Sequence, residues 1–550
     1  MKFARIATLV TALSLPFSAF AQEAEPQPAS ESADPRLVVA ISVDQLSADI
    51  FAQHRENFSG GFARLLSGVV FPSGYQAHSA TETCPGHSTI LTGSHPGRAG
   101  VVGNRWFDMS VARDDTRIYC SEDPTVEGSS SSDYTVSTNN LLVPTLGDLL
   151  QRVDDASQIV SVAGKDRSAV MLGGSGADHM YWPGDAGFTT FAGRELPEAV
   201  QRINETAMQA AVSSRVALPV PQHCNAFNRA IPIGDDVTVG THVFSRGPTT
   251  DSRQILASPE GDLLTLVLAA DLVSELSLGQ GETTDLLAIG LASTDYIGHA
   301  YGTHGVEMCV QLTALDTMLG DFFDRLDARG ISYVVVLTAD HGGLDLPERQ
   351  VGQAAPRAAR LLPGFETLDE RLATETGLEA PILRADSPFG DFYVDRSVPE
   401  GRRTEVIDRA IAMISAHPQV YRVYGRDEIM AQTVTDAPPE HWTVLDRVRA
   451  NFHPDRSGDF IVVLQPRITP IPQPFPGAYV ATHGSVWDYD RRVPILFWWP
   501  GAEQFEQPLG VMTVDIMPTL ASLIDLDISD VEIDGRCLDL MPDVAETNCR

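Results

Sequence analysis

Carboxylate and imidazole side chains occur in the sequence with spacings that suit metal binding. Asp295 and His299 are four residues apart, so both would lie on one face of a helical turn. Asp340 and His341 are adjacent and precede two glycines that permit a tight turn. Taken alone, the first pair is also typical of a surface ion pair and the second of an ordinary turn. With Asp44 and His483 they form a mixed carboxylate and imidazole set, which suits zinc best. The candidate ligands are Asp44, Asp295, His299, Asp340, His341 and His483.

A candidate nucleophile stands in the segment from Thr81 to Gly93. Pro85 suits the first turn of a helix, which would put Thr83 at the helix N-cap or just before it. There the hydroxyl oxygen meets unpaired backbone N–H groups and the positive end of the helix dipole, which favour an alkoxide and a bound phosphate. An ordinary threonine cap is the alternative interpretation of this segment.

The candidate ligands follow stretches that we predict to be buried strands. Short apolar runs rich in β-branched residues are typical of strands covered on both faces. Helical patterns such as Glu307 to Leu326 lie between these runs. We therefore expect an α/β fold with a mostly parallel central sheet flanked by helices, with the site at the carboxyl ends of its strands. The expected strands are Arg36 to Val43, Gln158 to Ala163, Asp285 to Leu291, Tyr333 to Leu337 and Pro494 to Trp499, and a helix near Asp515 to Leu526 follows the last.

The first 35 residues differ in composition from the rest of the chain. Residues 1–21 read as a signal peptide, with basic residues, an apolar run and a small-residue cleavage pattern. Residues 22–35 are rich in Pro, Ser, Ala and acidic residues and predict a flexible leader. We expect one catalytic domain over 36–545, with insertions at roughly 178–282 and 347–470. The apolar run of the signal peptide is too short to span a membrane, and no later segment has ~20 consecutive apolar residues, so we expect a periplasmic or secreted protein without a membrane span.

Charge and cysteine content narrow the choice of partners. Lys and Arg total 39 against 73 Asp and Glu, a net charge of −34, which repels nucleic acid and anionic lipid. Six cysteines in an exported chain allow disulfides, and Cys537 with Cys549 is the pairing we favour because it encloses a short loop. The sequence contains no CxxC, which argues against a cysteine zinc site.

These motifs resemble the alkaline phosphatase superfamily, and more closely its branch with a threonine nucleophile. That branch includes nucleotide pyrophosphatase/phosphodiesterases and certain periplasmic alkaline phosphatases. The resemblance extends from about 36 to 543. Sulfatases of the superfamily have a cysteine or serine nucleophile followed by x-Pro-x-Arg. Counted from Cys84, the position of that Arg holds Ser88, which argues against a sulfatase. The motifs that carry the resemblance are the strand ending in Asp44, Thr83-x-Pro-Gly-His87, Gly103-Asn104-x-Trp106, Asp295-x-x-x-His299, Asp340-His341-Gly342 and Thr482-His483-Gly484.

The resemblance implies a role for each matched residue. One zinc ion would be held by Asp295, His299 and His483, and a second by Asp44, Thr83, Asp340 and His341. Asn104 is similar to the residue that donates a hydrogen bond to a phosphoryl oxygen. Lys165-x-Arg167 resembles a pair found in the threonine-type alkaline phosphatases and absent from the related diesterases, and two cations suit a fully charged phosphoryl group.

The expected activity is hydrolysis of small phosphate monoesters by an alkaline phosphatase with two Zn²⁺ per chain and a phosphothreonine at Thr83. A nucleotide phosphodiesterase or pyrophosphatase is the enzymatic alternative. A catalytically silent protein that binds phosphate or metal is the alternative outside enzymes. The sequence carries no signature of the natural substrate or of the oligomeric state.

Overall fold

A computed structural model describes residues 35–213, 218–234, 237–241, 244, 247–350, 358–475, 477–543 and 546–549. The predicted signal peptide and all but the last residue of the predicted leader lie outside the described residues. The described residues belong to one compact unit, Asp34–Arg550. None of the helices in this part of the chain combines the length and hydropathy that a membrane crossing requires.

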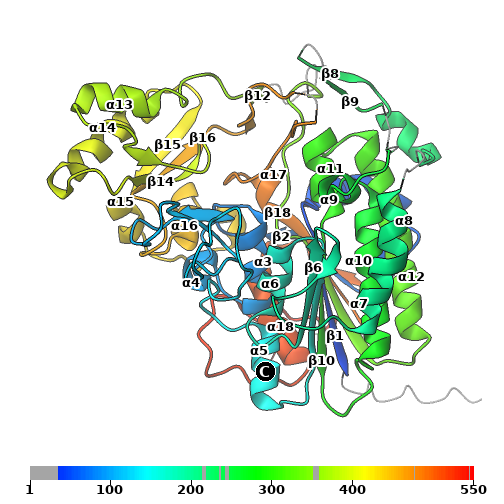
Figure 1. Ribbon diagram of the computed structural model, residues 1–550. Coiled ribbons are helices and arrows are strands. Elements are labelled where there is room, and N and C mark those ends of the chain that lie inside the picture. Colours follow the sequence, from blue (N-terminus) through cyan, green and yellow to red (C-terminus); the bar gives the residue numbers. More distant parts are fainter. Residues whose placement is uncertain are drawn as a thin grey trace, which may run out of the picture. The chain divides into compact units, whose positions relative to one another are not determined.

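The centre of the described structure is a ten-stranded sheet whose middle strands are parallel (Figure 1). β1 (Leu37–Val43) lies between β10 (Asp285–Leu291) and β11 (Tyr333–Thr338), and β5 (Ile159–Ala163) and β6 (His179–Gly184) continue the parallel series beyond β10. Every residue of β1, β5, β10 and β11 is buried, as the unbroken apolar runs predict. The predicted α/β fold with a mostly parallel sheet is confirmed.

Toward both edges of this sheet the pairing is no longer uniformly parallel. The predicted last strand is β18 (Arg492–Trp498), which pairs antiparallel with β11 on one side and with β2 (Val69–Tyr75) on the other. Its register with β2 shifts between Val493 and Ile495, and the intervening Pro494 has no N–H to donate to a neighbouring strand. The remaining edge strands are β7 (Gly187–Thr189), which pairs antiparallel with β6, and β19 (Phe505–Glu506) and β20 (Val511–Met512), which pair parallel with β2.

Helices cover both faces of the sheet (Figure 1). On one face, α10 (Pro259–Glu275) and α12 (Val306–Asp327) contribute to a core cluster with alternate side chains of β1 and β10. On the other, α3 (Thr83–Thr92), α6 (Asp166–Gly173) and α18 (Ile516–Leu523) pack against the opposite set. The shorter helices are α1 (Ala48–His54), α2 (Gly61–Leu65), α4 (Pro96–Ala99), α5 (Leu146–Val153), α7 (Glu198–Ile203), α8 (Gln209–Val212), α9 (Ser252–Leu256), α11 (Ser293–Tyr301) and α17 (Asp488–Arg491).

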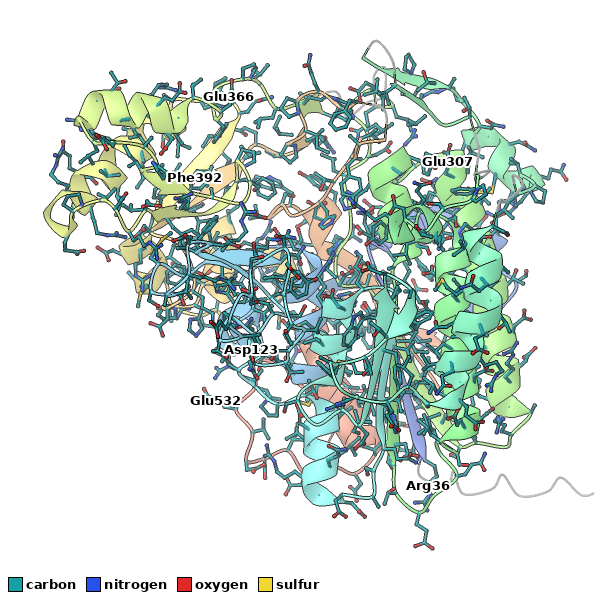
Figure 2. All side chains as sticks on the ribbon, viewed as in Figure 1. Arg36, Asp123, Glu307, Glu366, Phe392 and Glu532 are labelled. Atoms are coloured by element: carbon teal, nitrogen blue, oxygen red, sulfur yellow. A yellow bond between two sulfur atoms is a disulfide. The ribbon has the colours of Figure 1, made fainter. Side chains whose placement is uncertain are left out.

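The two predicted insertions differ in structure. The segment 178–282 begins with β6 and β7 of the central sheet and then forms the hairpin of β8 (Ile231–Ile233) and β9 (Val237–Val239). The segment 347–470 contains a separate four-stranded sheet with its own apolar core, which includes the labelled Phe392 (Figure 2). Its elements are β12 (Ala359–Arg360), α13 (Leu368–Thr376), β13 (Leu383–Arg384), β14 (Gly390–Val394), α14 (Arg403–Ser415), β15 (Val420–Gly425), α15 (Arg426–Ala431), α16 (Val444–Asn451), β16 (Phe460–Leu464) and β17 (Ile468–Thr469).

All six cysteines are paired. The expected bond between Cys537 and Cys549 is present. The other two disulfides join Cys84 to Cys120 and Cys224 to Cys309, residues too far apart in sequence for their pairing to be evident from spacing. Cys84 directly follows Thr83, so the pairing removes the thiol that would compete with the Thr83 hydroxyl as a nucleophile.

Helix α3 approaches the end of β11 so closely that only glycine fits between them. A Cβ atom at Gly86 would overlap with the carbonyl oxygen of Asp340. Gly86 therefore sets the distance between the helix that begins at Thr83 and the strand that leads to Asp340 and His341.

We expect Gly86→Ala to lower the free energy of unfolding by roughly 1 to 3 kcal/mol, because an added methyl group in a packed core forces the backbone apart. Urea unfolding monitored by circular dichroism measures this. Gly401→Ala is the matched control, since its Cβ would meet no atom within 4 Å. Equal stability of Gly86→Ala and the unaltered protein would contradict the close contact.

Candidate functional site

The predicted site residues gather at the carboxyl ends of four adjacent strands. Asp44 follows β1 directly, Lys165 comes two residues after β5, and Asp340 two residues after β11. Asp295 and His299 lie on α11, which begins two residues after β10. Because these strands are parallel and neighbouring, their carboxyl ends bring side chains from distant parts of the chain to one edge of the sheet.

One group of potential metal ligands consists of Asp44, Asp340 and His341. His341 Nε2 lies 3.4 Å from Asp44 Oδ1 and 3.3 Å from Asp340 Oδ2, and all three side chains are buried. Among the described residues, Asp44 Oδ1 and His341 Nε2 have no hydrogen-bond partner. Burial lowers the pKa of His341 to about 3, so its ring is neutral and available as a ligand. Buried polar atoms without partners, in a set of two carboxylates and an imidazole, fit a metal ion.

A second group consists of Asp295, His341 and His483. Asp295 Oδ1 lies 3.4 Å from His483 Nε2 and 3.2 Å from His299 Nε2. The Nδ1 atoms of His299 and His483 lie 2.8 and 2.7 Å from backbone carbonyl oxygens, which turns both Nε2 atoms toward Asp295. The rings of His341 and His483 are stacked, 3.6 Å apart, so the two groups adjoin at His341.

Lys165 connects the two groups. Its Nζ donates to Asp44 Oδ2 and to Asp295 Oδ2, both at 2.6 Å, and lies 5.1 Å from the centre of the Tyr296 ring. Burial disfavours the charged ammonium, but Asp295 and Asp44 outweigh this and raise the pKa of Lys165. The ammonium thus offsets the charge of two buried carboxylates that belong to different ligand groups.

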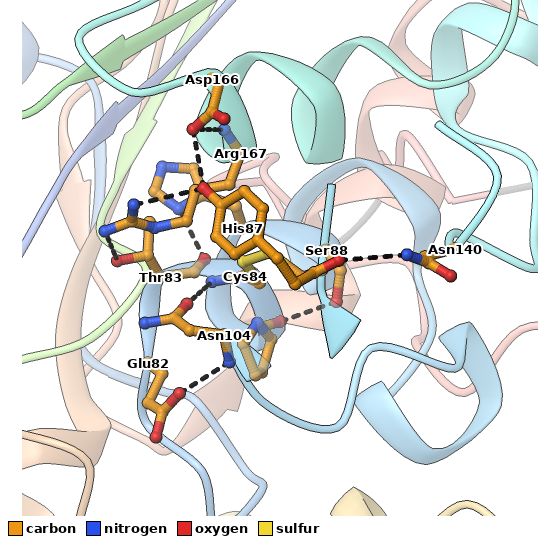
Figure 3. Close-up of a disulfide and its surroundings, with 12 residues drawn as sticks. Glu82, Thr83, Cys84, His87, Ser88, Asn104, Asn140, Asp166 and Arg167 are labelled. Atoms are coloured by element: carbon orange, nitrogen blue, oxygen red, sulfur yellow. Dashed lines mark hydrogen bonds between the residues drawn. A yellow bond between two sulfur atoms is a disulfide. The ribbon is translucent and has the colours of Figure 1, made fainter. Parts of the chain in front are cut away.

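Thr83 is the first residue of α3, one position later than the sequence predicts, since Glu82 is the N-cap. Its hydroxyl oxygen lies 3.4 Å from Nη2 of Arg167 (Figure 3). Side-chain Oδ1 of Asn104 accepts a hydrogen bond from the Cys84 backbone N–H at 2.8 Å. The backbone N–H of Asn104 donates to the Glu82 carboxylate. Because Oδ1 of Asn104 is engaged, the amide nitrogen Nδ2 is the group that can donate to a ligand near Thr83.

Two residues at the site received no role from the sequence. The backbone N–H of Gln45 donates to Asp340, 3.1 Å away, and its side-chain Nε2 donates to Asp295, 2.7 Å away, so one residue contacts both ligand groups. His87 Nδ1 lies 2.8 Å from the Thr83 carbonyl oxygen and 3.0 Å from Asp340 Oδ2. For His87, the four-residue spacing from Thr83 on one helix could have indicated that the two residues lie close together. Nothing in the sequence indicated the position of Gln45.

Two further features bear on the extent of the site. A cavity of about 80 Å³ adjoins His483, and Glu82, Arg105 and Phe389 are among its lining residues. The cavity reaches from the central unit to the separate four-stranded sheet. A third cluster of potential ligands includes His223, but its two cysteines form a disulfide and cannot bind a metal ion as thiolates.

Comparison with known proteins gives a consistent result. The profile of the family described as Type I phosphodiesterase / nucleotide pyrophosphatase matches residues 38–485. The chain is 46% identical to alkaline phosphatase PhoK of Sphingomonas sp over 92% of this chain and 91% of that protein. It is 44% identical to alkaline phosphatase PhoD of Zymomonas mobilis over 93% and 89% of the two chains. The crystal structure of alkaline phosphatase PafA superimposes with a TM-score of 0.77 at 26% identity, covering 91% of this chain and 99% of that one.

Proposed function

The chain belongs to the Type I phosphodiesterase / nucleotide pyrophosphatase family, and on that premise we propose that it transfers the phosphoryl group of a phosphate monoester to Thr83 in a zinc-dependent reaction. Its activity is that of an alkaline phosphatase, a phosphomonoesterase, as in the relatives that match over about nine tenths of its length. The observation that carries the mechanism is the contact between Arg167 and the Thr83 hydroxyl at the start of α3, a helix that His87 joins to Asp340 of one ligand group.

The reaction proceeds in two displacements. Thr83 Oγ1 attacks phosphorus, the bond from phosphorus to the ester oxygen breaks, and the alcohol leaves with a proton. Water then attacks the phosphothreonine, which releases inorganic phosphate and restores the Thr83 hydroxyl. Two features of the chain support Thr83 in this role. The neighbouring Cys84 is held in a disulfide, and the N-terminus of α3 favours a phosphoryl group beside the hydroxyl.

Buried atoms without hydrogen-bond partners support a metal site at Asp44 and His341, and the convergence of two imidazoles on Asp295 supports a second. Asp44, Asp340 and His341, with the hydroxyl of Thr83, would hold one zinc ion, and Asp295, His299 and His483 the other. When bound, the two ions supply Lewis-acid stabilisation for the attacking hydroxyl and for the departing oxygen. Carboxylates alone would leave several uncompensated charges at this buried edge, and Lys165 offsets only part of them.

The remaining polar groups would bind the phosphoryl oxygens. Arg167 reaches the Thr83 hydroxyl, and Asn104 has its Nδ2 available for donation. Lys165 lies between the ligand groups, where an ammonium attracts a dianion. The cavity beside His483 offers space for the alcohol portion of a small phosphate monoester. The signal-like N-terminus and the three disulfides support a periplasmic or secreted location.

Replacing the nucleophile tests the first step. We expect Thr83→Ala to reduce kcat by at least about a thousandfold, because the variant lacks the attacking hydroxyl and the adjacent Cys84 is held in a disulfide and cannot replace it. Thr92→Ala is the control, since Thr92 is a buried threonine on the same helix whose hydroxyl bonds within its own turn. Near-normal phosphatase activity of Thr83→Ala would refute the phosphothreonine mechanism.

Removing metal tests the ligand assignment. We expect about two zinc ions per chain by elemental analysis, loss of activity on chelation and recovery on adding zinc. His341→Ala should reduce the zinc content of both sites, because His341 adjoins both groups. His179→Ala, on β6 and outside both groups, should retain the full content. Full activity with less than about one zinc per chain would contradict the two-metal proposal.

Substrate charge tests the role of Arg167. A phosphoryl monoester carries two negative charges at alkaline pH and a diester one, so the guanidinium should favour the monoester. A hydrogen bond to a charged group contributes roughly 1.5 to 3 kcal/mol, or about 10- to 100-fold in rate. We expect Arg167→Ala to lower monoester kcat/KM by such a factor and diester kcat/KM much less, with the exposed Arg152→Ala as control. Equal losses on both esters would favour the phosphodiesterase alternative.

A further inference from the structure

The residue between Lys165 and Arg167 is the centre of a hydrogen-bond network beside the site. Asp166 Oδ1 accepts from the Tyr119 hydroxyl at 2.7 Å and from the backbone N–H of Arg167 at 2.7 Å. Asp166 Oδ2 accepts from the Tyr134 hydroxyl at 2.8 Å. Figure 3 shows Asp166 above the guanidinium of Arg167 and on the side away from Glu82. Three donors thus orient one carboxylate.

The network reaches the nucleophile through a single guanidinium. A tyrosine hydroxyl has one proton, and Tyr119 donates that proton to Asp166. Its oxygen lone pairs therefore remain to accept from Nη1 of Arg167, 3.4 Å away. The other terminal nitrogen of Arg167, Nη2, lies 3.4 Å from the Thr83 hydroxyl. The carboxylate of Asp166 thus fixes the direction of the Tyr119 hydroxyl. Tyr119 in turn fixes Nη1 of the planar guanidinium, whose Nη2 faces Thr83.

A covalent bond fixes Tyr119 relative to Thr83. Tyr119 ends β4 (Arg117–Tyr119), and the next residue, Cys120, forms a disulfide with Cys84, which directly follows Thr83. β4 pairs antiparallel with β3 (Arg105–Phe107), and Cys120 N–H donates to the carbonyl of Asn104 at 3.0 Å. The disulfide and the pairing of β3 with β4 therefore fix three groups relative to one another: the Tyr119 hydroxyl, the side-chain amide of Asn104 and the Thr83 hydroxyl.

The chemistry of the network suits alkaline conditions. Burial, with a further contribution from the Asp166 carboxylate, raises the pKa of Tyr119 to about 12. The hydroxyl accordingly stays protonated and keeps its direction over the pH range in which a phosphate monoester is a dianion. The ordinary pKa values of lysine and histidine are lower, so either residue at this place would begin to deprotonate and lose its charge at or near alkaline pH.

We propose that Asp166, Tyr119 and Tyr134 form a clamp that positions the guanidinium of Arg167 against the phosphoryl group on Thr83, and that the clamp thereby contributes to the preference for monoesters. The proposal rests on the proposed function, which gives Arg167 its ligand. All three are positioning residues, because each acts through Arg167: Tyr119 contacts its guanidinium, and Asp166 contacts its backbone N–H. Tyr134 bonds to Asp166 and packs on the ring of Tyr119, with 4.5 Å between the ring centres, so it acts on Arg167 only through these two residues and its contribution is the smallest.

A purely structural role for Asp166 makes a different prediction. Asp166 is the first residue of α6, where an acidic side chain favours the helix by interaction with its dipole. Loss of that stabilisation would lower the stability of the protein and would affect all substrates alike. A clamp affects only what Arg167 does, so its effect disappears when Arg167 is absent.

A double-mutant cycle separates the two roles. Tyr119→Phe, Tyr134→Phe and Asp166→Asn are each made in the unaltered enzyme and in Arg167→Ala. Each holoenzyme is assayed for kcat/KM on an aryl phosphate monoester and on the corresponding bis-aryl diester, and for inhibition by inorganic phosphate. Tyr181→Phe is the matched control, because Tyr181 is a buried tyrosine on β6 whose hydroxyl contacts His179 instead. Thermal unfolding midpoints monitor the fold.

We expect Tyr119→Phe and Asp166→Asn each to lower monoester kcat/KM by about tenfold and to raise the inhibition constant of phosphate by a similar factor, as for loss of a charged hydrogen bond. Diester kcat/KM should fall by less than about twofold. In the Arg167→Ala background the same changes should have no further effect. Tyr134→Phe should shift the monoester values in the same direction by less, and Tyr181→Phe should shift none.

Equal factors in both backgrounds, or equal losses on both esters, would overturn the clamp. If Asp166→Asn does not fold, Tyr119→Phe decides, because it removes a single oxygen atom. Failure of the proposed function has a separate signature: the unaltered holoenzyme would lack monoesterase activity, or Arg167→Ala would leave the ratio of monoester to diester unchanged. The clamp alone fails if Arg167→Ala changes that ratio and Tyr119→Phe does not.

Discussion

The burial of three carboxylates at one edge of the central sheet is the constraint on which the site depends. Asp44, Asp295 and Asp340 are almost completely removed from solvent. A buried charge is unfavourable unless other charges and hydrogen bonds compensate it. Lys165 compensates two of the three, and Gln45 donates to two, but Asp44 Oδ1 keeps no hydrogen-bond partner in the described structure, and Asp340 Oδ2 has histidine ring nitrogens as its neighbours. The arrangement is thus suited to bind cations, and the imidazoles around it specify which kind.

The fold satisfies this constraint through strands that run in one direction. Parallel strands end at the same edge, so residues separated by hundreds of positions meet without long loops. Helix α3 then brings a hydroxyl to that edge, and the glycine at position 86 permits its close approach to β11. His87 joins the same helix to Asp340, so the nucleophile and one ligand group share a support.

The cations around Thr83 have different tasks. Lys165 neutralises carboxylates from both ligand groups, so its position follows from the charge of the metal sites. The backbone N–H of Arg167 donates to the Asp166 carboxylate, but the hydrogen bonds of its guanidinium in the described structure go to a phenol and to the nucleophile. The adjacent Asp166 carboxylate bonds to two tyrosine hydroxyls and to the backbone N–H of Arg167. Because it does not bond to the guanidinium, the guanidinium remains able to bind an anion.

The sequence by itself determined the buried strands of the central sheet and the pairing of Cys537 with Cys549, placed the start of a helix to within one residue of Thr83, and proposed the candidate ligands. These features are local: an unbroken apolar run, a proline in a first turn and a short loop each depend on neighbouring residues. The tertiary structure alone decided that His341 adjoins both ligand groups, that Gln45 spans them, and that Cys84 pairs with Cys120. It also decided that β2 and β6, whose strands contain Pro and Gly, belong to the central sheet. Such features depend on which distant segments the packing of the sheet brings together, and no local pattern encodes those distances.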